Sequence, residues 1–523
     1  MSDSNQIEKR KSPKGLIAII VAIVVLIGGA AVAMSMISSS LKVTYFKAEK
    51  DSYDFIVEQL EEKYAPELEW YNKTKEAATE SKIDISANYN TPAQEAMLMD
   101  PAQIINNSTL TVLTQTDMEN KEISAGISAN VAGLSVDGFN LFVTADDLLI
   151  QTPFINELLQ IKDEDIGPLL NELDPAGFDG EASIDFAKIF ERQGEFLTEE
   201  EKDYLKKEYL DLLYDELSED SFSSTDETIE VNGQSVKTEK IEMALTEDEV
   251  KELLSLTFDK MKEDERIKEM IKDQLTYGQL GGSLVETEIE EALGEFENSL
   301  EQAKQEIANL HISNGLNSTV WINDGLIVQR DFSFEIGPSE EELVKLSVTG
   351  SQLLTAASQW FDYDFAFADL YDEGSLQLAG ELTWEDNKAN DIVTLTAADT
   401  VLTYEGTETL EDGSRNFERK LLFNDSVENA EVQWNGVSSY DKDQMDSEHT
   451  FKLGTVNLPI DTVGLQLNIE GKVIDSVEMP ENENFRDLGM MSIEELNNYF
   501  ETEFYPSFEE WMYGLLMGGA AGF

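Results

Sequence analysis

The chain has 523 residues, of which 41% are hydrophobic, and its formal net charge is −69 at pH 7. So acidic a surface repels phosphate backbones, which excludes nucleic acid as a partner. The absence of cysteine excludes disulfides, thiol catalysis, cysteine-ligated zinc and a lipid-modified cysteine anchor. The acidic residues are spread along the chain, a pattern that favours a solvated exterior over attraction of one basic partner.

An apolar run of 22 residues begins at Leu16 and ends at Ile37, inside a charge-free window between Lys14 and Lys42. At about 1.5 Å per residue it extends about 33 Å, enough to cross a bilayer core. By the positive-inside rule, we predict a basic cytoplasmic tail at residues 1–14, a transmembrane anchor at 15–37 and an extracellular bulk. The protein is thus expected in the cell membrane, as a single-pass protein that contacts the lipid bilayer through this run.

A cleaved signal peptide is the alternative interpretation of the same run. Ala31-Val32-Ala33 satisfies the small-x-small pattern of a cleavage site. The apolar residues continue beyond it to Ile37, which favours an uncleaved anchor. Both interpretations place the bulk of the chain outside the cell.

Residues 38–81 are predicted to form a helical stalk. Helical spacing of apolar residues predicts a helix over residues 48–64, which Pro66 interrupts, and a polar stretch follows to Ser81. Residues 82–310 are predicted to form an α+β half with a helical block. Its alternating segments predict strands over residues 83–85, 110–116, 123–131 and 139–143, a loop over 90–107, and tight turns at Asp137-Gly138 and Asp146-Asp147.

The helical block is predicted over residues 154–217 and is followed by a hairpin turned at Asn232-Gly233. Thr198-x-x-Glu201 and Thr246-x-x-Glu249 are capping boxes that each predict the start of a helix. Apolar residues over 289–310 recur at alternating spacings of four and three. This seam would suit a coiled-coil partner, but packing on the protein's own core is favoured.

Residues 311–490 are predicted to form an antiparallel β half, because the apolar period changes to two at Asn317. Asp324-Gly325 is a type I′ hairpin signature, and further strands with short polar turns continue to residue 469. The fold class is therefore α+β: a large curved antiparallel β-sheet, arranged as a meander, is packed by amphipathic helices and joined to one N-terminal transmembrane helix. Similar segments at residues 146–151 and 324–329 leave open whether the two halves are duplicated.

Residues 491–523 are predicted to form C-terminal helices and an apolar tail. Ser492-x-x-Glu495 and Ser507-x-x-Glu510 read as capping boxes on either side of Pro506. The uncharged tail begins at Trp511 and ends at Phe523, too short to span a bilayer. Docking onto the domain is favoured over interfacial contact with the membrane.

Carboxylate clusters are the only abundant chemistry in the chain. They lack the glycine and distal glutamate of a calcium loop, so solvated turns are favoured. Two clusters stand out: Asp441, Asp443 and Asp446, and Asp362, Asp364, Asp369 and Asp372. Histidine chemistry would have to use His311 or His449, and neither accompanies a Gly-x-Ser-x-Gly elbow or a phosphate loop. We therefore assign no catalytic, cofactor-binding or metal-ligating residue, expect no cofactor, and predict that the protein is not an enzyme.

Two resemblances follow from particular segments. The anchor, the segment Tyr45-Phe46-Lys47-Ala48-Glu49-Lys50 and the helix opening Leu245-Thr246-Glu247-Asp248-Glu249 resemble an uncharacterised family of single-pass surface proteins of Bacillus-like bacteria, a domain of unknown function. The hairpin from Trp321 to Phe332 is similar to one in lipoprotein-localisation-type lipid carriers. That second resemblance implies a curved antiparallel sheet folded around helices and enclosing an apolar cavity, and neither resemblance implies site residues.

We therefore expect a membrane-anchored, extracellular, non-catalytic protein that binds a hydrophobic or envelope-derived ligand between sheet and helices. The first alternative is a protein-interaction or scaffold ectodomain that meets a basic protein partner through the acidic surface or the 289–310 seam. The second alternative is a hydrolase built on carboxylates, which would need two or three acids converging in a cleft.

Overall fold

A computed structural model describes residues 40–90, 101–173, 186–192, 196–277, 286–480 and 484–519. The expected anchor at residues 15–37, the basic tail at 1–14 and the Ala31-Val32-Ala33 site lie outside these ranges. No helix within the ranges is both long enough and apolar enough to cross a membrane.

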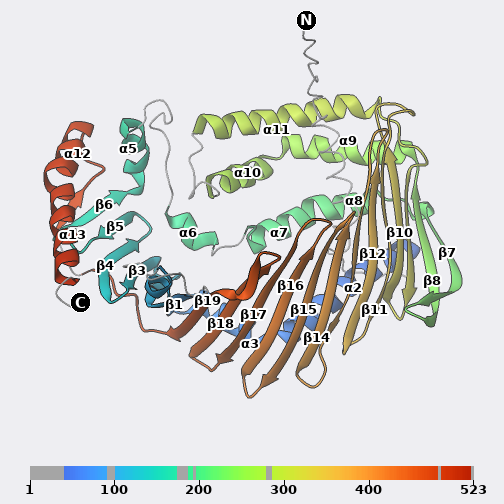
Figure 1. Cartoon of the computed structure of the whole chain (residues 1–523). Coiled ribbons are helices and arrows are strands. Elements are labelled where there is room, and N and C mark those ends of the chain that lie inside the picture. Colours follow the sequence, from blue (N-terminus) through green and yellow to red (C-terminus); the bar gives the residue numbers. More distant parts are fainter. Residues whose placement is uncertain are drawn as a thin grey trace, which may run out of the picture.

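One open sheet of 20 strands organises the molecule (Figure 1). In order across the sheet, the strands are β7 (Phe222–Val231), β8 (Gln234–Leu245), β9 (Leu316–Asn323), β10 (Leu326–Ile336), β11 (Val344–Leu354), β12 (Ser358–Ala368), β13 (Glu373–Thr383), β14 (Lys388–Ala397), β15 (Thr400–Glu411), β16 (Ser414–Asn424), β17 (Asn429–Tyr440), β18 (Gln444–Thr455), β19 (Leu458–Val473), β1 (Thr79–Tyr89), β2 (Ser108–Asp117), β3 (Glu122–Val131), β4 (Leu134–Val143), β5 (Asp147–Gln151), β6 (Leu158–Lys162) and β20 (Phe485–Asp487).

The expected α+β class with a large antiparallel meander is confirmed. Strands β7 to β19 follow each other in chain order, and β19 then pairs with β1, where Thr79 lies opposite Val473. Neighbouring strands are antiparallel except β20, which runs parallel to β6. Strands from both 82–310 and 311–490 share this sheet, and the division of the chain into domains stays a prediction.

The expected hairpin turns form where glycine tolerates a positive φ. Asn232-Gly233 has φ values of 48° and 73°, and Asp324-Gly325 has 50° and 85°, as a type I′ turn requires. The expected turn at Asp137-Gly138 is wrong. Gly138 has a positive φ but lies inside β4, beside a register shift between β3 and β4. The Asp137-Gly138 dipeptide therefore forms part of a β-bulge.

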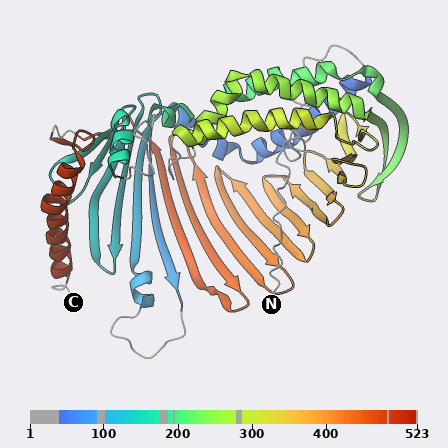
Figure 2. The ribbon, with the colours of Figure 1, turned by 90° about the horizontal axis from the view of Figure 1, so that it is seen from above.

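Most helices lie on one face of the sheet, whereas α4 lies at the end of β1 (Figures 1 and 2). Their bounds are α2 (Leu41–Lys63), α3 (Ala65–Glu76), α4 (Pro101–Asn106), α5 (Ile166–Leu173), α6 (Ala187–Arg192), α7 (Glu199–Leu205), α8 (Asp211–Glu216), α9 (Glu247–Glu263), α10 (Glu265–Tyr277), α11 (Glu286–Ile307), α12 (Ile493–Tyr499) and α13 (Tyr505–Gly519). Short 3₁₀ turns are η2 (Asp163–Asp165) and η4 (Glu219–Ser221), and π-helical turns are η3 (Lys206–Leu210) and η6 (Phe500–Phe504).

Three expected segments need correction. The polar stretch after Pro66 is helical, because the proline sits in the first turn of α3, where its missing N–H is not needed. The block at 154–217 contains strand β6, which a short apolar run does not distinguish from a helix. Ser507 lies inside α13 and caps nothing, since the wide turn η6 before Pro506 lets one helix continue past the proline.

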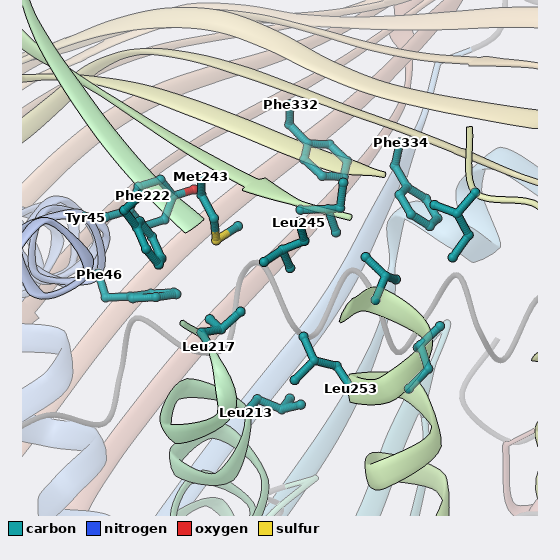
Figure 3. Close-up of a cluster of buried hydrophobic side chains, with 14 of the residues drawn as sticks. Tyr45, Phe46, Leu213, Leu217, Phe222, Met243, Leu245, Leu253, Phe332 and Phe334 are labelled. Atoms are coloured by element: carbon teal, nitrogen blue, oxygen red, sulfur yellow. The ribbon is translucent and has the colours of Figure 1, made fainter. Parts of the chain in front are cut away.

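The largest core joins helices to the β7–β11 end of the sheet (Figure 3). Tyr45 and Phe46 of α2 meet Phe222 of β7 edge to face, at ring-centroid distances of 5.7 and 6.1 Å. The 289–310 seam packs into this core through Leu300, Ala303, Ile307 and Leu310, as the favoured interpretation expected. Smaller cores place α5, α6 and α12 on β4, β5 and β6 at the opposite end.

Candidate functional site

The register sorts side chains onto two unlike faces of the sheet. On β16, Arg415, Phe417 and Leu421 share the face that carries the helices, which we call the inner face, whereas Glu418 and Lys420 point outward. The pairing carries this alternation from strand to strand, because partners in register point to the same side. The outer face is polar and acidic, while the inner face is largely apolar.

Apolar residues continue across the inner face from one strand to the next. Cross-strand partners include Val348↔Phe365↔Leu376, Leu378↔Leu395↔Leu402↔Phe423, Tyr404↔Leu421↔Val432↔Leu453↔Val463, and Leu467↔Ile85↔Leu110↔Ala129. From β12 to β4 this run crosses eleven strand spacings, about 53 Å at about 4.8 Å each.

Much of this run is exposed, although large apolar side chains normally lie in a core. We call the exposed inner-face residues the trough floor: Phe365, Phe367, Leu421, Leu453, Val463, Leu465, Leu110, Ile127, Val131 and Leu141. Helices α9 and α11 close one end of the trough and α5, α6 and α12 close the other, through the cores described above. Between these helices, the ten floor residues are 36–53% exposed in the described part of the chain.

Helices α2 and α3 form a strap that crosses the inner face along one end of the strands. Glu49 accepts two hydrogen bonds from Arg330 on β10, one of 2.7 Å. Farther along, the Lys63 Nζ and Asp391 Oδ2 atoms are 2.5 Å apart, with both side chains buried. At the far end of the strap, Lys73 reaches Asp443 beyond β17, at 3.1 Å.

The central fastening is a buried charge network around Glu408 of β15, whose side chain is 0% exposed. Arg415, 1% exposed, donates to Glu408 at 3.0 Å and to Glu67 of the strap at 2.5 Å, while Arg419 donates to Glu408 at 2.6 Å. Burial alone would lower the pKa of Arg415, but the carboxylates of Glu67 and Glu408 outweigh it and raise that pKa. Arg415 therefore stays charged, and its hydrogen bonds to Glu67 and Glu408 hold the strap on the sheet.

The strap also presents apolar side chains beside the floor. Tyr64 donates a hydrogen bond from its hydroxyl to Glu408 on β15, at 3.4 Å. Its ring therefore points from the strap toward the inner face of the sheet. Leu60 and Leu68 lie one turn before and after Tyr64 and share its side of the strap, and Tyr53 and Tyr71 continue the same spacing. All four of these neighbours are exposed. The trough thus has an aliphatic floor and a partly aromatic wall.

An aromatic cluster lies between the charge network and the floor. Trp434 stacks on Phe451 at 5.5 Å and donates from Nε1 to His449 Nδ1 at 3.2 Å. The Arg419 guanidinium lies 4.5 Å from the centre of the Trp434 ring. Burial, and then the charge of Arg419, lower the pKa of His449. His449 is therefore a neutral packing residue near pH 7.

The clusters singled out in the sequence do not converge. Asp443 meets Lys73 of the strap, and Asp362 accepts from Gln377 on the next strand at 2.9 Å. His311 takes part in a backbone bridge to Gly337. Across the described ranges, no group of three or more His, Cys, Asp or Glu side chains could hold a metal ion.

Sequence reasoning missed the fastening residues and the bare floor. A usable signal was the scarcity of arginine: the chain has seven, and Arg330, Arg415 and Arg419 each interrupt an otherwise apolar strand face. No comparable signal marks the floor, because an exposed and a buried apolar face have the same alternation.

The fold and the site define an α+β protein whose open antiparallel sheet carries an apolar trough on its helical face. No protein-family model and no curated protein matches this chain. The solved structures most similar to it include the crystal structure of Acinetobacter baumannii OccAB2, with 5% identity over 76% of this chain and 97% of that chain, at a TM-score of 0.25. Pseudomonas aeruginosa OccK9 (OpdG) has 6% identity over 76% and 97% of the two chains, at a TM-score of 0.24. A likeness this low has no bearing on fold or function.

Proposed function

We propose that this protein is a non-catalytic, membrane-anchored exterior protein that binds the acyl chains of a lipid in its trough. The observation that carries the proposal is the exposed apolar floor between two helical caps. Contiguous exposed apolar surface is uncommon on monomeric proteins and marks a site that something apolar covers.

The backbone of the floor favours an acyl chain over a peptide. Each floor strand lies inside the sheet and pairs on both sides, so its N–H and C=O groups are already bonded. A peptide that adds to a sheet needs a free edge, whereas an acyl chain needs only apolar contact. The floor is also longer, at about 53 Å, than the roughly 30 Å core of a bilayer, so it accommodates extended chains.

The sequence supplies the location. An anchor at residues 15–37, directly before the strap, would hold the trough close to the outer surface of a cell membrane. The resemblance of the 321–332 hairpin to lipid carriers points to the same class of ligand.

Photocrosslinking of the full chain in vesicles tests the proposal. The vesicles contain phosphatidylcholine with a diazirine near the end of one acyl chain, and crosslinked peptides are mapped by mass spectrometry. We expect crosslinks on β12 to β19 of the trough floor. L421D combined with L453D should reduce them about tenfold, because losing about 1.4 kcal/mol of apolar contact is a tenfold change.

The matched control is I392D combined with V437D. These two side chains, on β14 and β17 of the same sheet, are similarly exposed but point to the outer face. This variant should leave floor crosslinking unchanged. Crosslinks confined to residues 16–37, or an equal loss in both double variants, would refute acyl binding in the trough.

A further inference from the structure

The two ends of the strands form two rims with different turns. The strap rim lies beside α2 and α3 and includes the turns at Asn232-Gly233, Asp324-Gly325 and Asp412-Gly413. The opposite rim, which we call the open rim, lies at the other ends of the strands, where α4 packs beside the end of β1 (Figure 2). It includes the turns between β12 and β13, β16 and β17, and β18 and β19.

Three open-rim turns share one design. Asp369 Oδ1 accepts from the backbone N–H groups of Tyr371 and Asp372, and Asp425 Oδ1 accepts from those of Val427 and Glu428. Thr455 Oγ1 accepts from the N–H groups of Asn457 and Leu458. A side chain at the first position thus closes each turn from within.

Each of these turns projects an apolar side chain into solvent. Leu370 and Tyr371 are 58% and 67% exposed, Val427 is 83% exposed and Val456 is 70% exposed. Phe367, just before the first turn, belongs to the trough floor, so the apolar surface continues from the floor to the rim.

The turn design itself does not require apolar tips. On the strap rim, Thr355 Oγ1 accepts from the N–H of Ser358 in the same way, and the exposed residues there are Thr355 and Ala356, neither of them large and apolar. At Thr144, which accepts from the N–H groups of Asp146 and Asp147, the exposed residue is Asp146. Large apolar tips are therefore a property of the open rim among these side-chain-closed turns.

We propose that the open rim is a membrane-contact edge, on which Leu370, Tyr371, Val427 and Val456 insert into the interfacial region of a bilayer. This inference rests on the proposed function, since it supplies the route by which acyl chains pass from a membrane onto the floor. The tips lie about four and about two strand spacings apart, roughly 19 and 10 Å. Separated single side chains suit a fluid lipid surface better than a complementary protein pocket.

The absence of cysteine from the chain makes a site-specific test direct. The full chain, carrying V427C or V456C, is labelled with an environment-sensitive fluorophore and reconstituted in phosphatidylcholine vesicles. Quenching is measured with phosphatidylcholine spin-labelled near the top of its acyl chain. We expect a blue shift and at least twofold quenching at both open-rim positions, and none for the matched strap-rim control A356C.

Two results would overturn the contact edge. Equal quenching at Val427 and Ala356 would mean that the anchor alone brings the whole molecule close to lipid. A blue shift at Val427 that needs no lipid and grows with protein concentration would assign the rim to a second copy of this chain.

A variant pair separates this inference from the proposed function. L421D combined with L453D alters the floor, so it should abolish floor crosslinking and leave quenching at V427C unchanged. L370S combined with Y371S alters the rim, so it should reduce quenching at V456C and slow the appearance of floor crosslinks. Absence of quenching at V427C and V456C, in proteoliposomes that still show floor crosslinks, would refute the rim and retain the trough.

Discussion

Glu408 is the residue on which the strap most depends, because three side chains donate hydrogen bonds to its buried carboxylate. Arg415 and Arg419 give it two charged partners, and Tyr64 adds a hydroxyl from the strap. A carboxylate buried from solvent depends on such partners, and the buried Arg415 depends on the carboxylate in turn. Asp391 forms a similar buried ion pair with Lys63 of the strap.

E408Q keeps the shape of this side chain and removes its charge. We expect the free energy of unfolding to fall by about 3–5 kcal/mol, because the substitution leaves buried guanidinium groups short of a counter-charge. Urea unfolding followed by tryptophan fluorescence measures the change. The control D461N breaks an exposed pair with Lys452 and should cost less than about 1 kcal/mol. Equal midpoints for the two variants would contradict the central role of Glu408.

The strap forms one wall of the trough. Its close contact with the sheet at β19 depends on a glycine. Gly471 on β19 faces α3, where a Cβ atom would lie 2.7 Å from the Trp70 ring. Gly464 on the same strand has room for a Cβ in ordinary van der Waals contact, 3.6 Å from its nearest neighbour. Substituting each glycine by alanine thus distinguishes a clash with the strap, at Gly471, from the general effect of alanine on strand conformation, at Gly464.

G471A should destabilise the protein by about 1–3 kcal/mol through overpacking, and it should raise amide hydrogen exchange in α3. G464A should be neutral or slightly stabilising, since glycine costs about 0.5–1 kcal/mol inside a strand. Hydrogen exchange with mass spectrometry distinguishes the two. An unchanged exchange rate in α3 of G471A would show that Trp70 moves aside freely.

Elements with local signals were predictable, and those set by distant contacts were not. The capping boxes at Thr198, Thr246 and Ser492 form as expected, because each joins residues three positions apart. Strand β12 carries Asp362 and Asp364 among aromatic residues, and its place becomes clear only from pairing with β11 and β13. Local bonds follow from sequence spacing, whereas strand pairing depends on which neighbours are available.

At the scale of the whole molecule, the charge of −69 limits which membranes the open rim can approach. Asp369, Asp372, Asp425 and Glu428 surround its apolar tips. Repulsion from an anionic surface costs about 1 kcal/mol for each charge close to it and falls off within a Debye length.

Quenching of V427C should therefore fall several-fold when phosphatidylglycerol replaces half of the phosphatidylcholine. It should recover as salt rises from 0.1 to 1 M, because the Debye length shrinks from about 10 Å to about 3 Å. The A356C probe serves as the reference at every composition. Quenching that changes with neither lipid charge nor salt would contradict this prediction, because it would show that electrostatic repulsion does not limit contact of the rim with the membrane.

The sequence by itself determined the antiparallel class and the turns at Asn232-Gly233 and Asp324-Gly325. It also determined the helix starts at Thr198, Thr246 and Ser492, because each of these features depends on residues a few positions apart. Only the tertiary structure decided that β19 pairs with β1, which joins residues such as Val473 and Thr79 from opposite ends of the chain. It also decided which turns share a rim and which part of the apolar face the described helices leave exposed. Alternation predicts that a face is apolar, but exposure depends on how far the helices reach across it.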